Sequence, residues 1–137
     1  MNLIELLNTI PKIKKNIVIF DIDDTLINTT NWLENKPIVD FYKYLINNGY
    51  NTAIITAREN QPYVINNTIK DLESIGVTNY KYLIFMNYQQ ENDILKYKEN
   101  ARKYITNQGY EPIMSIGDKY WDMGKYGGIG ILVSSRN

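Results

Sequence analysis

The segment Ile17-Val18-Ile19-Phe20-Asp21-Ile22-Asp23-Asp24-Thr25-Leu26 decides the fold of this 137-residue chain. Its first four residues form a continuous apolar run, which is typical of a strand covered on both faces in a parallel sheet. Ligands bind such sheets outside the carboxyl ends of the strands. Asp21 and Asp23 follow at that end, and two carboxylates can divide nucleophilic attack and proton transfer between them. In an alternative interpretation, Asp23 or Asp24 only caps the following turn, because aspartate often bonds its own backbone there.

The composition narrows the chemistry that is open to the chain. The absence of cysteine and histidine excludes disulfides, thiolate nucleophiles, cysteine-ligated zinc and a histidine base. Catalysis would therefore use carboxylates, hydroxyls, lysine, arginine or a hard cation bound by oxygen. The 15 Lys and Arg residues balance the 15 Asp and Glu residues, so the net charge favours neither nucleic acid nor an anionic membrane as a partner.

Apolar stretches separated by proline and glycine predict strands that alternate with helices. Strands are expected near residues 16–21, 52–56, 82–85, 112–116 and 129–133. Helices are expected near residues 3–10, 37–49, 62–76, 91–107 and 119–126. Short loops between them require right-handed crossovers. The prediction is an α/β fold, with a three-layer, doubly wound, mostly parallel five-stranded sheet in one domain over residues 1–137.

The ends of other predicted strands also carry polar side chains. Thr56 ends the second strand, Asp118 follows the fourth, and Asp122 lies four residues further on. Because parallel strands end at one edge of the sheet, these residues are expected near Asp21, and oxygen ligands of this kind suit Mg²⁺. In the alternative, Asp118 is a turn residue and Asp122 is stabilised by a helix dipole.

Lys98 lies on the apolar stripe of the helix predicted at 91–107, together with Ala101 and Ile105. An ammonium group that faces inward needs an anionic partner, either a phosphate or the carboxylates at the sheet edge. In the alternative, Lys98 extends its ammonium past the stripe into water. Arg102, one turn further on, is either a site residue or a surface charge.

Four segments, in this order, resemble the haloacid dehalogenase (HAD) superfamily of phosphatases. They are Asp21-Ile22-Asp23-Asp24-Thr25, Ala53-Ile54-Ile55-Thr56, Lys98 and Gly117-Asp118-Lys119-Tyr120-Trp121-Asp122. Within the superfamily, the stretch Lys98-Glu99-Asn100-Ala101-Arg102 followed by Gly109-Tyr110 is similar to the acid phosphatase branch, class B/C of subfamily III. The resemblance implies a HAD-like, Rossmannoid core.

The resemblance also implies a Mg²⁺-dependent phosphomonoester hydrolase. Asp21 would be the nucleophile that becomes an aspartyl-phosphate, and Asp23 would transfer protons. Thr56 would bind a phosphate oxygen, and Lys98 would neutralise charge and orient Asp21. The implied magnesium ligands are the carboxylates of Asp21 and Asp118, the backbone carbonyl of Asp23 and, directly or through water, Asp122.

Superfamily members owe substrate specificity to cap inserts, and only about a dozen residues separate Thr25 from Pro37, too few for a separate domain. An essentially capless core should admit bulky phosphomonoesters, unless a partner subunit in an oligomer closes it. The candidate substrate-binding residues are Thr25, Trp32, Arg58 and Arg102. For Arg58 a surface role is the alternative. The aromatic residues expected near this edge are Trp32, Tyr88, Tyr120 and Trp121, for which packing is favoured over stacking on a substrate.

Two other functions remain open. The first is a polynucleotide 3′-phosphatase, in which nucleic acid is a partner only as substrate. The second is a storage or binding protein that keeps the HAD fold without catalysis, although the presence of both Asp21 and Asp23 argues against that loss. No apolar stretch long enough for a membrane span and no signal peptide is evident, so the expected location is cytoplasmic, with no membrane partner.

Overall fold

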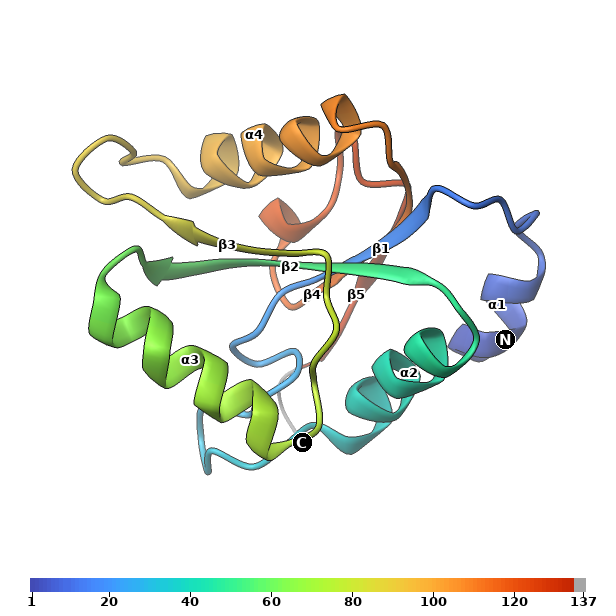
Figure 1. Ribbon diagram of the computed structural model, residues 1–137, viewed down its shortest axis with the longest axis horizontal. Helices are drawn as coiled ribbons and strands as arrows, with labels where there is room; N and C mark the ends of the chain where they lie inside the picture. The colour runs from blue at the N-terminus through green and yellow to red at the C-terminus, as the bar shows by residue number, and fades with distance from the viewer. Residues whose placement is uncertain (135–137) are drawn as a thin grey trace.

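The computed structural model describes residues 1–134 and contains one parallel sheet with helices on both faces (Figure 1). The strands are β1 (Asn16–Phe20), β2 (Asn51–Glu59), β3 (Tyr82–Met86), β4 (Glu111–Gly117) and β5 (Ile129–Leu132). The helices are α1 (Leu3–Asn8), α2 (Lys36–Asn47), α3 (Pro62–Ser74), α4 (Ile94–Asn107) and the one-turn 3-10 helix η1 (Tyr120–Asp122). The strand order is β3-β2-β1-β4-β5, and all the strand pairs are parallel. The predicted α/β class is confirmed. The last three residues of the predicted domain, 135–137, lie outside the described residues.

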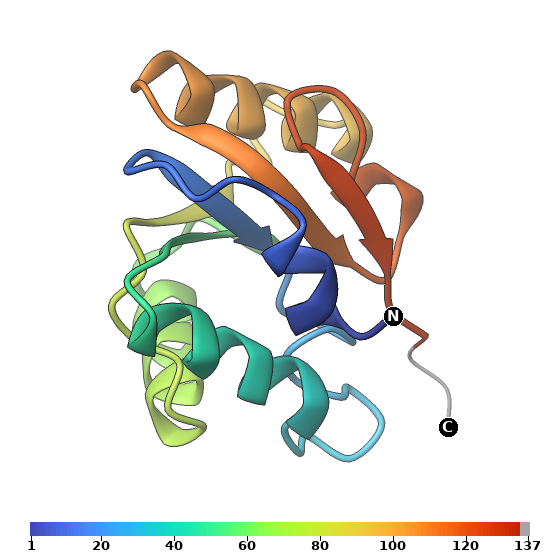
Figure 2. The same ribbon diagram turned by 90° about the vertical axis from the view of Figure 1, so that its right-hand side faces the viewer.

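Strand β1 is buried on both faces, which explains its continuous apolar run. Helices α1, α2 and α3 cover one face of the sheet, while α4 and η1 lie on the other (Figure 2). Val18 and Phe20 belong to the core on the α2 face. Ile17 and Ile19 belong to the core on the α4 face. The alternation of side chains along one strand therefore supplies both apolar layers of the domain.

The central position of β1 creates the crevice in which such folds bind ligands. From β1 the chain passes through α2 to β2, whereas from β3 it crosses back through α4, on the opposite face, to β4. In sheets of this kind, ligands bind at the carboxyl ends of the two strands whose connections leave in opposite directions, and by this rule the expected crevice lies between β1 and β4. Residues 21–35 form a compact loop beside this crevice, tied by a bridge between Ile27 and Glu34. The core is thus essentially capless, as predicted.

Strand β2 is longer than predicted and continues past Thr56 to Glu59. The pairing of β2 with β3 becomes irregular between Ile55 and Glu59. Two tyrosine hydroxyls donate to backbone carbonyls in this stretch, from Tyr97 to Thr56 and from Tyr88 to Ala57. These tyrosines, which are distant in the sequence, take the place of a regular β3 partner for the two carbonyls. The spacing of apolar residues within β2 cannot predict such contacts.

Helix α4 begins at Ile94 rather than at residue 91, because the Asp93 side chain accepts a hydrogen bond from the backbone amide of Lys96. It is 14 residues long. Within residues 1–134, no helix has the length and apolarity needed to cross a membrane.

The helix predicted over residues 119–126 is reduced to the single turn of η1. The guanidinium of Arg102 binds backbone carbonyls of this segment, which a longer helix would use for its own hydrogen bonds. The carbonyls belong to Trp121, Met123 and Lys125.

Candidate active site

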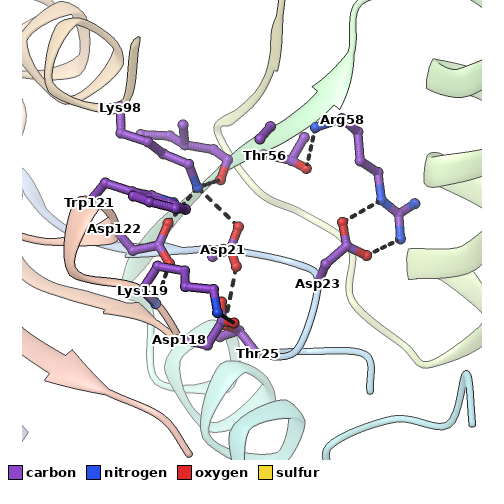
Figure 3. A network of polar contacts seen from close by, with 12 residues as sticks. Asp21, Asp23, Thr25, Thr56, Arg58, Lys98, Asp118, Lys119, Trp121 and Asp122 are labelled. Atoms are coloured by element: carbon purple, nitrogen blue, oxygen red, sulfur yellow. Dashed lines mark hydrogen bonds and ion pairs between the residues drawn. The ribbon is translucent and has the colours of Figure 1, made fainter. Parts of the chain in front are cut away.

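Three carboxylates meet at the crevice between β1 and β4 (Figure 3). Asp21 directly follows β1, Asp118 follows β4, and Asp122 ends η1. One carboxylate oxygen from each lies within 4.8 Å of the others. The chain therefore brings together residues that are almost 100 positions apart, as parallel strand ends are expected to do.

Lys98 reaches this carboxylate group from α4 and is only 2% exposed. Its Nζ donates to Asp21 Oδ1 at 3.0 Å, to Asp122 Oδ1 at 2.6 Å and to the carbonyl oxygen of Ile55 at 2.9 Å. Burial lowers the pKa of Lys98, but the two carboxylates outweigh that effect and leave the pKa raised. The alternative in which Lys98 extends into water is wrong.

Both carboxylate oxygens of Asp21 have partners within the protein. One of its oxygens binds Lys98, and the other accepts a hydrogen bond from the buried hydroxyl of Thr25 at 3.3 Å. Burial is the main cause that raises the pKa of Asp21 to about 7, and the neighbouring Asp122 also raises it, while Lys98 opposes the shift. Burial likewise raises the pKa of Asp118.

The donor set at this site suits a hard divalent cation. Three carboxylates outnumber the buried ammonium of Lys98 and the exposed ammonium of Lys119, which lies 3.8 Å from Asp118, so the group has excess negative charge when all are ionised. Carboxylate oxygens are the ligands that Mg²⁺ and Ca²⁺ prefer. A bound cation would also offset the burial that raises the pKa of Asp21 and of Asp118.

We expect the stability of the metal-free protein to fall as the pH rises from about 4 to about 7. The pKa of Asp21 is about 7 in the folded protein against 3.8 for an unperturbed carboxyl, so the folded state holds this proton more tightly. The stabilisation is therefore complete below the unfolded pKa and is lost as the pH approaches the folded pKa. Urea unfolding in EDTA, at several pH values, should show this slope in the wild type and a clearly smaller one in Asp21→Asn. Identical slopes would contradict the prediction.

Asp122 packs tightly against the end of β4, which explains the glycine before Asp118. A Cβ added at Gly117 would lie 2.2 Å from the Cβ of Asp122. One oxygen of Asp122 binds Lys98, and the other accepts a hydrogen bond from the amide of Lys119 at 3.1 Å. Asp122 thus belongs to the carboxylate group and also closes the turn of η1.

Arg102 was predicted to be either a site residue or a surface charge, and the structure gives it a third role. It is 1% exposed, so it is not a surface charge. Its guanidinium donates to three carbonyls of residues 121–125 at 2.8 to 3.2 Å, so it is directed at this loop rather than at a substrate. Arg102 therefore holds the loop that carries Asp122. Its position one turn after Lys98, on the same inward stripe, is the sequence signal that indicates burial.

Asp23 lies apart from the carboxylate group, and its side chain pairs with Arg58 (Figure 3). The Asp23 oxygens accept from Arg58 Nη2 at 2.8 Å and from Nε at 3.1 Å. The Arg58 backbone amide donates to the Thr56 hydroxyl oxygen at 3.0 Å, so Arg58 contacts both Asp23 and Thr56. Burial lowers the pKa of Arg58, but Asp23 and Asp71 leave it raised. The surface alternative for Arg58 is wrong, because the side chain is only 15% exposed.

The alternative in which Asp23 or Asp24 caps the turn is confirmed for Asp24. Its carboxylate accepts from the amide and the hydroxyl of Thr29 at 2.8 Å, and its backbone is left-handed, with φ of 61°. Asp24 therefore stabilises the loop that follows the first motif, whereas Asp23 remains directed at Arg58.

The aromatic residues near the edge are mostly exposed, so packing does not account for them. Trp32, Tyr88 and Tyr120 are 66%, 53% and 67% exposed. Trp121 is half-buried, and its ring contacts that of Tyr120 with centroids 5.2 Å apart. Loops at an open edge have no layer above them that could cover large side chains.

The comparison with protein families decides the assignment. The family described as "HAD superfamily, subfamily IIIB (Acid phosphatase)" matches residues 33–133. The chain belongs to this family. The part that matches the acid phosphatase family contains Thr56, Lys98, Asp118 and Asp122, whereas Asp21 and Asp23 precede it.

Two plant proteins are similar in sequence to this chain. The chain is similar to vegetative storage protein 1 of Arabidopsis thaliana, with 25% identity over 79% of this chain and 49% of that protein. Vegetative storage protein 2 of the same plant is 27% identical over 79% of this chain and 50% of that protein. The chain thus spans about half the length of these relatives.

A solved structure shares the fold. The class C acid phosphatase from Bacillus anthracis superposes with a TM-score of 0.66 and 18% sequence identity. The match covers 88% of this chain and 58% of that structure. At this level of identity, the likeness concerns the HAD-like fold alone.

Proposed function

We propose that this protein is a Mg²⁺-dependent phosphomonoester hydrolase that forms an aspartyl-phosphate on Asp21. The observation that supports it is the contact of Asp21 with Lys98 inside a three-carboxylate group at the crevice between β1 and β4. A structural ion pair would need one carboxylate for the Lys98 ammonium, whereas this ammonium contacts both Asp21 and Asp122, and Asp118 pairs with the exposed Lys119. Extra carboxylates beside a buried nucleophile are what a cation-assisted phosphoryl transfer requires.

In the first step, a carboxylate oxygen of Asp21 attacks phosphorus, and the bond from phosphorus to the leaving oxygen breaks. Asp23 gives its proton to that oxygen, so the product leaves as a neutral alcohol. Lys98 holds Asp21 in place and balances its charge. The Thr56 hydroxyl, whose oxygen already accepts from Arg58, directs its hydrogen to a phosphate oxygen.

In the second step, the Asp23 carboxylate takes a proton from a water molecule. The water oxygen attacks phosphorus, the bond from phosphorus to Asp21 breaks, and inorganic phosphate leaves. Both aspartates thereby return to their starting forms, which splits one difficult displacement into two easier ones.

The metal would be held by the carboxylates of Asp21, Asp118 and Asp122 and by the backbone carbonyl of Asp23. Mg²⁺, when bound, supplies positive charge that screens the repulsion between the nucleophile and a phosphate dianion. We propose Mg²⁺ rather than another hard cation because Mg²⁺ is usually bound by one or two carboxylates together with a substrate phosphate.

We expect the protein to release phosphate from 4-nitrophenyl phosphate in Mg²⁺ and to lose at least about a hundredfold in rate in EDTA, because the carboxylate group then keeps its full repulsion for phosphate. Excess Mg²⁺ should restore the rate, which serves as the control for irreversible damage. Equal rates in Mg²⁺ and EDTA would exclude metal dependence. No release under either condition, from this substrate or from the other phosphomonoester classes named below, would exclude the phosphatase.

The open edge favours bulky phosphomonoesters as substrates, unless a second subunit covers it. Assays with a sugar phosphate, a nucleotide, a phosphopeptide and a 3′-phosphorylated oligonucleotide would rank these classes. A preference for the oligonucleotide would support the narrower polynucleotide 3′-phosphatase.

A storage or binding role is the second candidate, favoured by the names of the two similar plant proteins. Against it, Asp21, Asp23 and Lys98 are all present and in contact with charged partners, an arrangement that storage does not need. Absence of turnover on every phosphomonoester class would favour the storage role.

A further inference from the structure

The carboxylate of Asp23 is held by Arg58 in a bidentate ion pair that joins the first motif to the end of β2. The two contacts are 2.8 and 3.1 Å long. Paired hydrogen bonds of this kind fix the orientation of a carboxylate as well as its distance, because the guanidinium is planar. Asp23 otherwise lies in a partly exposed loop, with a side chain 38% exposed.

Arg58 is itself held by α3. Its third nitrogen, Nη1, donates to the hydroxyl of Thr68 at 3.0 Å and lies 3.4 Å from the carboxylate of Asp71. Thr68 is almost fully buried. All three guanidinium nitrogens therefore have protein partners, two directed at Asp23 and one at α3.

We propose that Arg58 is a positioning residue that aims the Asp23 carboxyl group at the leaving-group oxygen, with Thr68 and Asp71 holding Arg58 in turn. This inference rests on the proposed function and deepens it. Direct binding of phosphate by Arg58 would require it to give up two charge-assisted hydrogen bonds to Asp23. The ion pair described above is that of the ionised carboxylate, whereas in the first step Asp23 must carry a proton. As Asp23 gives this proton to the leaving oxygen, it becomes the carboxylate that pairs with the guanidinium, so Arg58 stabilises the negative charge that develops.

If Arg58 acts through Asp23, its effect should depend on the leaving group of the assay substrate. In the step that forms the aspartyl-phosphate, an alkoxide needs the proton of Asp23, whereas a nitrophenolate can leave without one. A residue that acts through Asp23 should therefore matter for alkyl phosphates and little for 4-nitrophenyl phosphate. A residue that binds phosphate, or that only stabilises the fold, should affect both substrates equally.

The test compares kcat/KM for benzyl phosphate and 4-nitrophenyl phosphate, both with Mg²⁺. In Arg58→Met, we expect the benzyl value to fall at least about tenfold more than the nitrophenyl value, since proton transfer contributes about a hundredfold or more. In an Asp23→Asn background, the same change should alter the benzyl value by less than about twofold. Equal losses of kcat/KM on both substrates would overturn the proposal. So would a loss in the double variant that equals the product of the losses in the two single variants.

Asp71→Asn provides a milder variant, because this side chain is 53% exposed and its change should not endanger folding. It should lower the ratio of benzyl to nitrophenyl values in the same direction. Asp40→Asn is the matched control, because Asp40 is also an exposed helix aspartate, 53% exposed and paired with Lys36. A wild type that hydrolyses neither substrate refutes the proposed function, whereas a wild type active on both with an unchanged ratio in the variants refutes only the role of Arg58.

Discussion

Asp21→Asn should lower the hydrolysis of 4-nitrophenyl phosphate at least about a thousandfold, because an amide oxygen cannot form the covalent intermediate. The change keeps the size of the side chain and retains an oxygen that can accept from Lys98, which contacts Asp21 at 3.0 Å. The measurement is phosphate release at saturating Mg²⁺. It should be accompanied by mass spectrometry of acid-quenched protein, which should detect a phosphate adduct in the wild type alone.

The far-ultraviolet circular dichroism spectrum provides the control for Asp21→Asn, and it should match that of the wild type. A folded variant with wild-type turnover would refute the role of Asp21 as nucleophile. Asp24→Asn is a useful companion, because Asp24 is a neighbouring carboxylate that only bonds Thr29. Its turnover should stay within about threefold of the wild type, as is usual for the loss of one local hydrogen bond.

Lys98→Met should lower the free energy of unfolding by about 3 kcal/mol at neutral pH, because it leaves the buried carboxylates of Asp21 and Asp122 without their cation. The Lys98 ammonium lies 3.0 and 2.6 Å from these groups and is 2% exposed. Turnover should fall at least about a hundredfold if Asp21 is the nucleophile, since the positive charge beside Asp21 is lost. Urea unfolding in EDTA and a phosphate-release assay would measure the two effects.

Lys103→Met is the matched control, because Lys103 lies on the same helix but on its exposed side. Its stability should change by less than about 0.5 kcal/mol, as is usual for surface substitutions. The two variants have the same chemical change, so helix propensity and lost charge on the protein as a whole are equal. Equal stabilities for Lys98→Met and Lys103→Met would show that the buried contacts contribute nothing.

Local patterns in the sequence predicted much of the sheet and the carboxylate group. The unbroken apolar run before Asp21 is what a strand buried on both faces requires, and β1 has that burial. The inward stripe of α4 placed Lys98 correctly, because helical spacing reports which side of a helix is covered. Asp118 could be placed at the same edge as Asp21, since parallel strands end together.

Contacts between distant segments could not be predicted in this way. Arg58 and Asp23 are 35 positions apart, and neither neighbourhood has a pattern that names the other as partner. In the extension of β2 past Thr56, two backbone carbonyls accept hydrogen bonds from tyrosine hydroxyls that are distant in the sequence. The exposure of Trp32 was misjudged, because burial of a loop residue depends on what lies above it and not on its own hydrophobicity.

The spacing of Lys98 and Arg102 has a consequence for anyone who wishes to redesign this protein. Both side chains leave the same face of α4 one turn apart, and between them they bind Asp21 and the loop that carries Asp122. A substitution that shifts this helix would disturb both sets of contacts at once. Libraries aimed at new substrates should therefore leave residues 94–107 intact and vary the exposed side chains of residues 30–33 and 88–90.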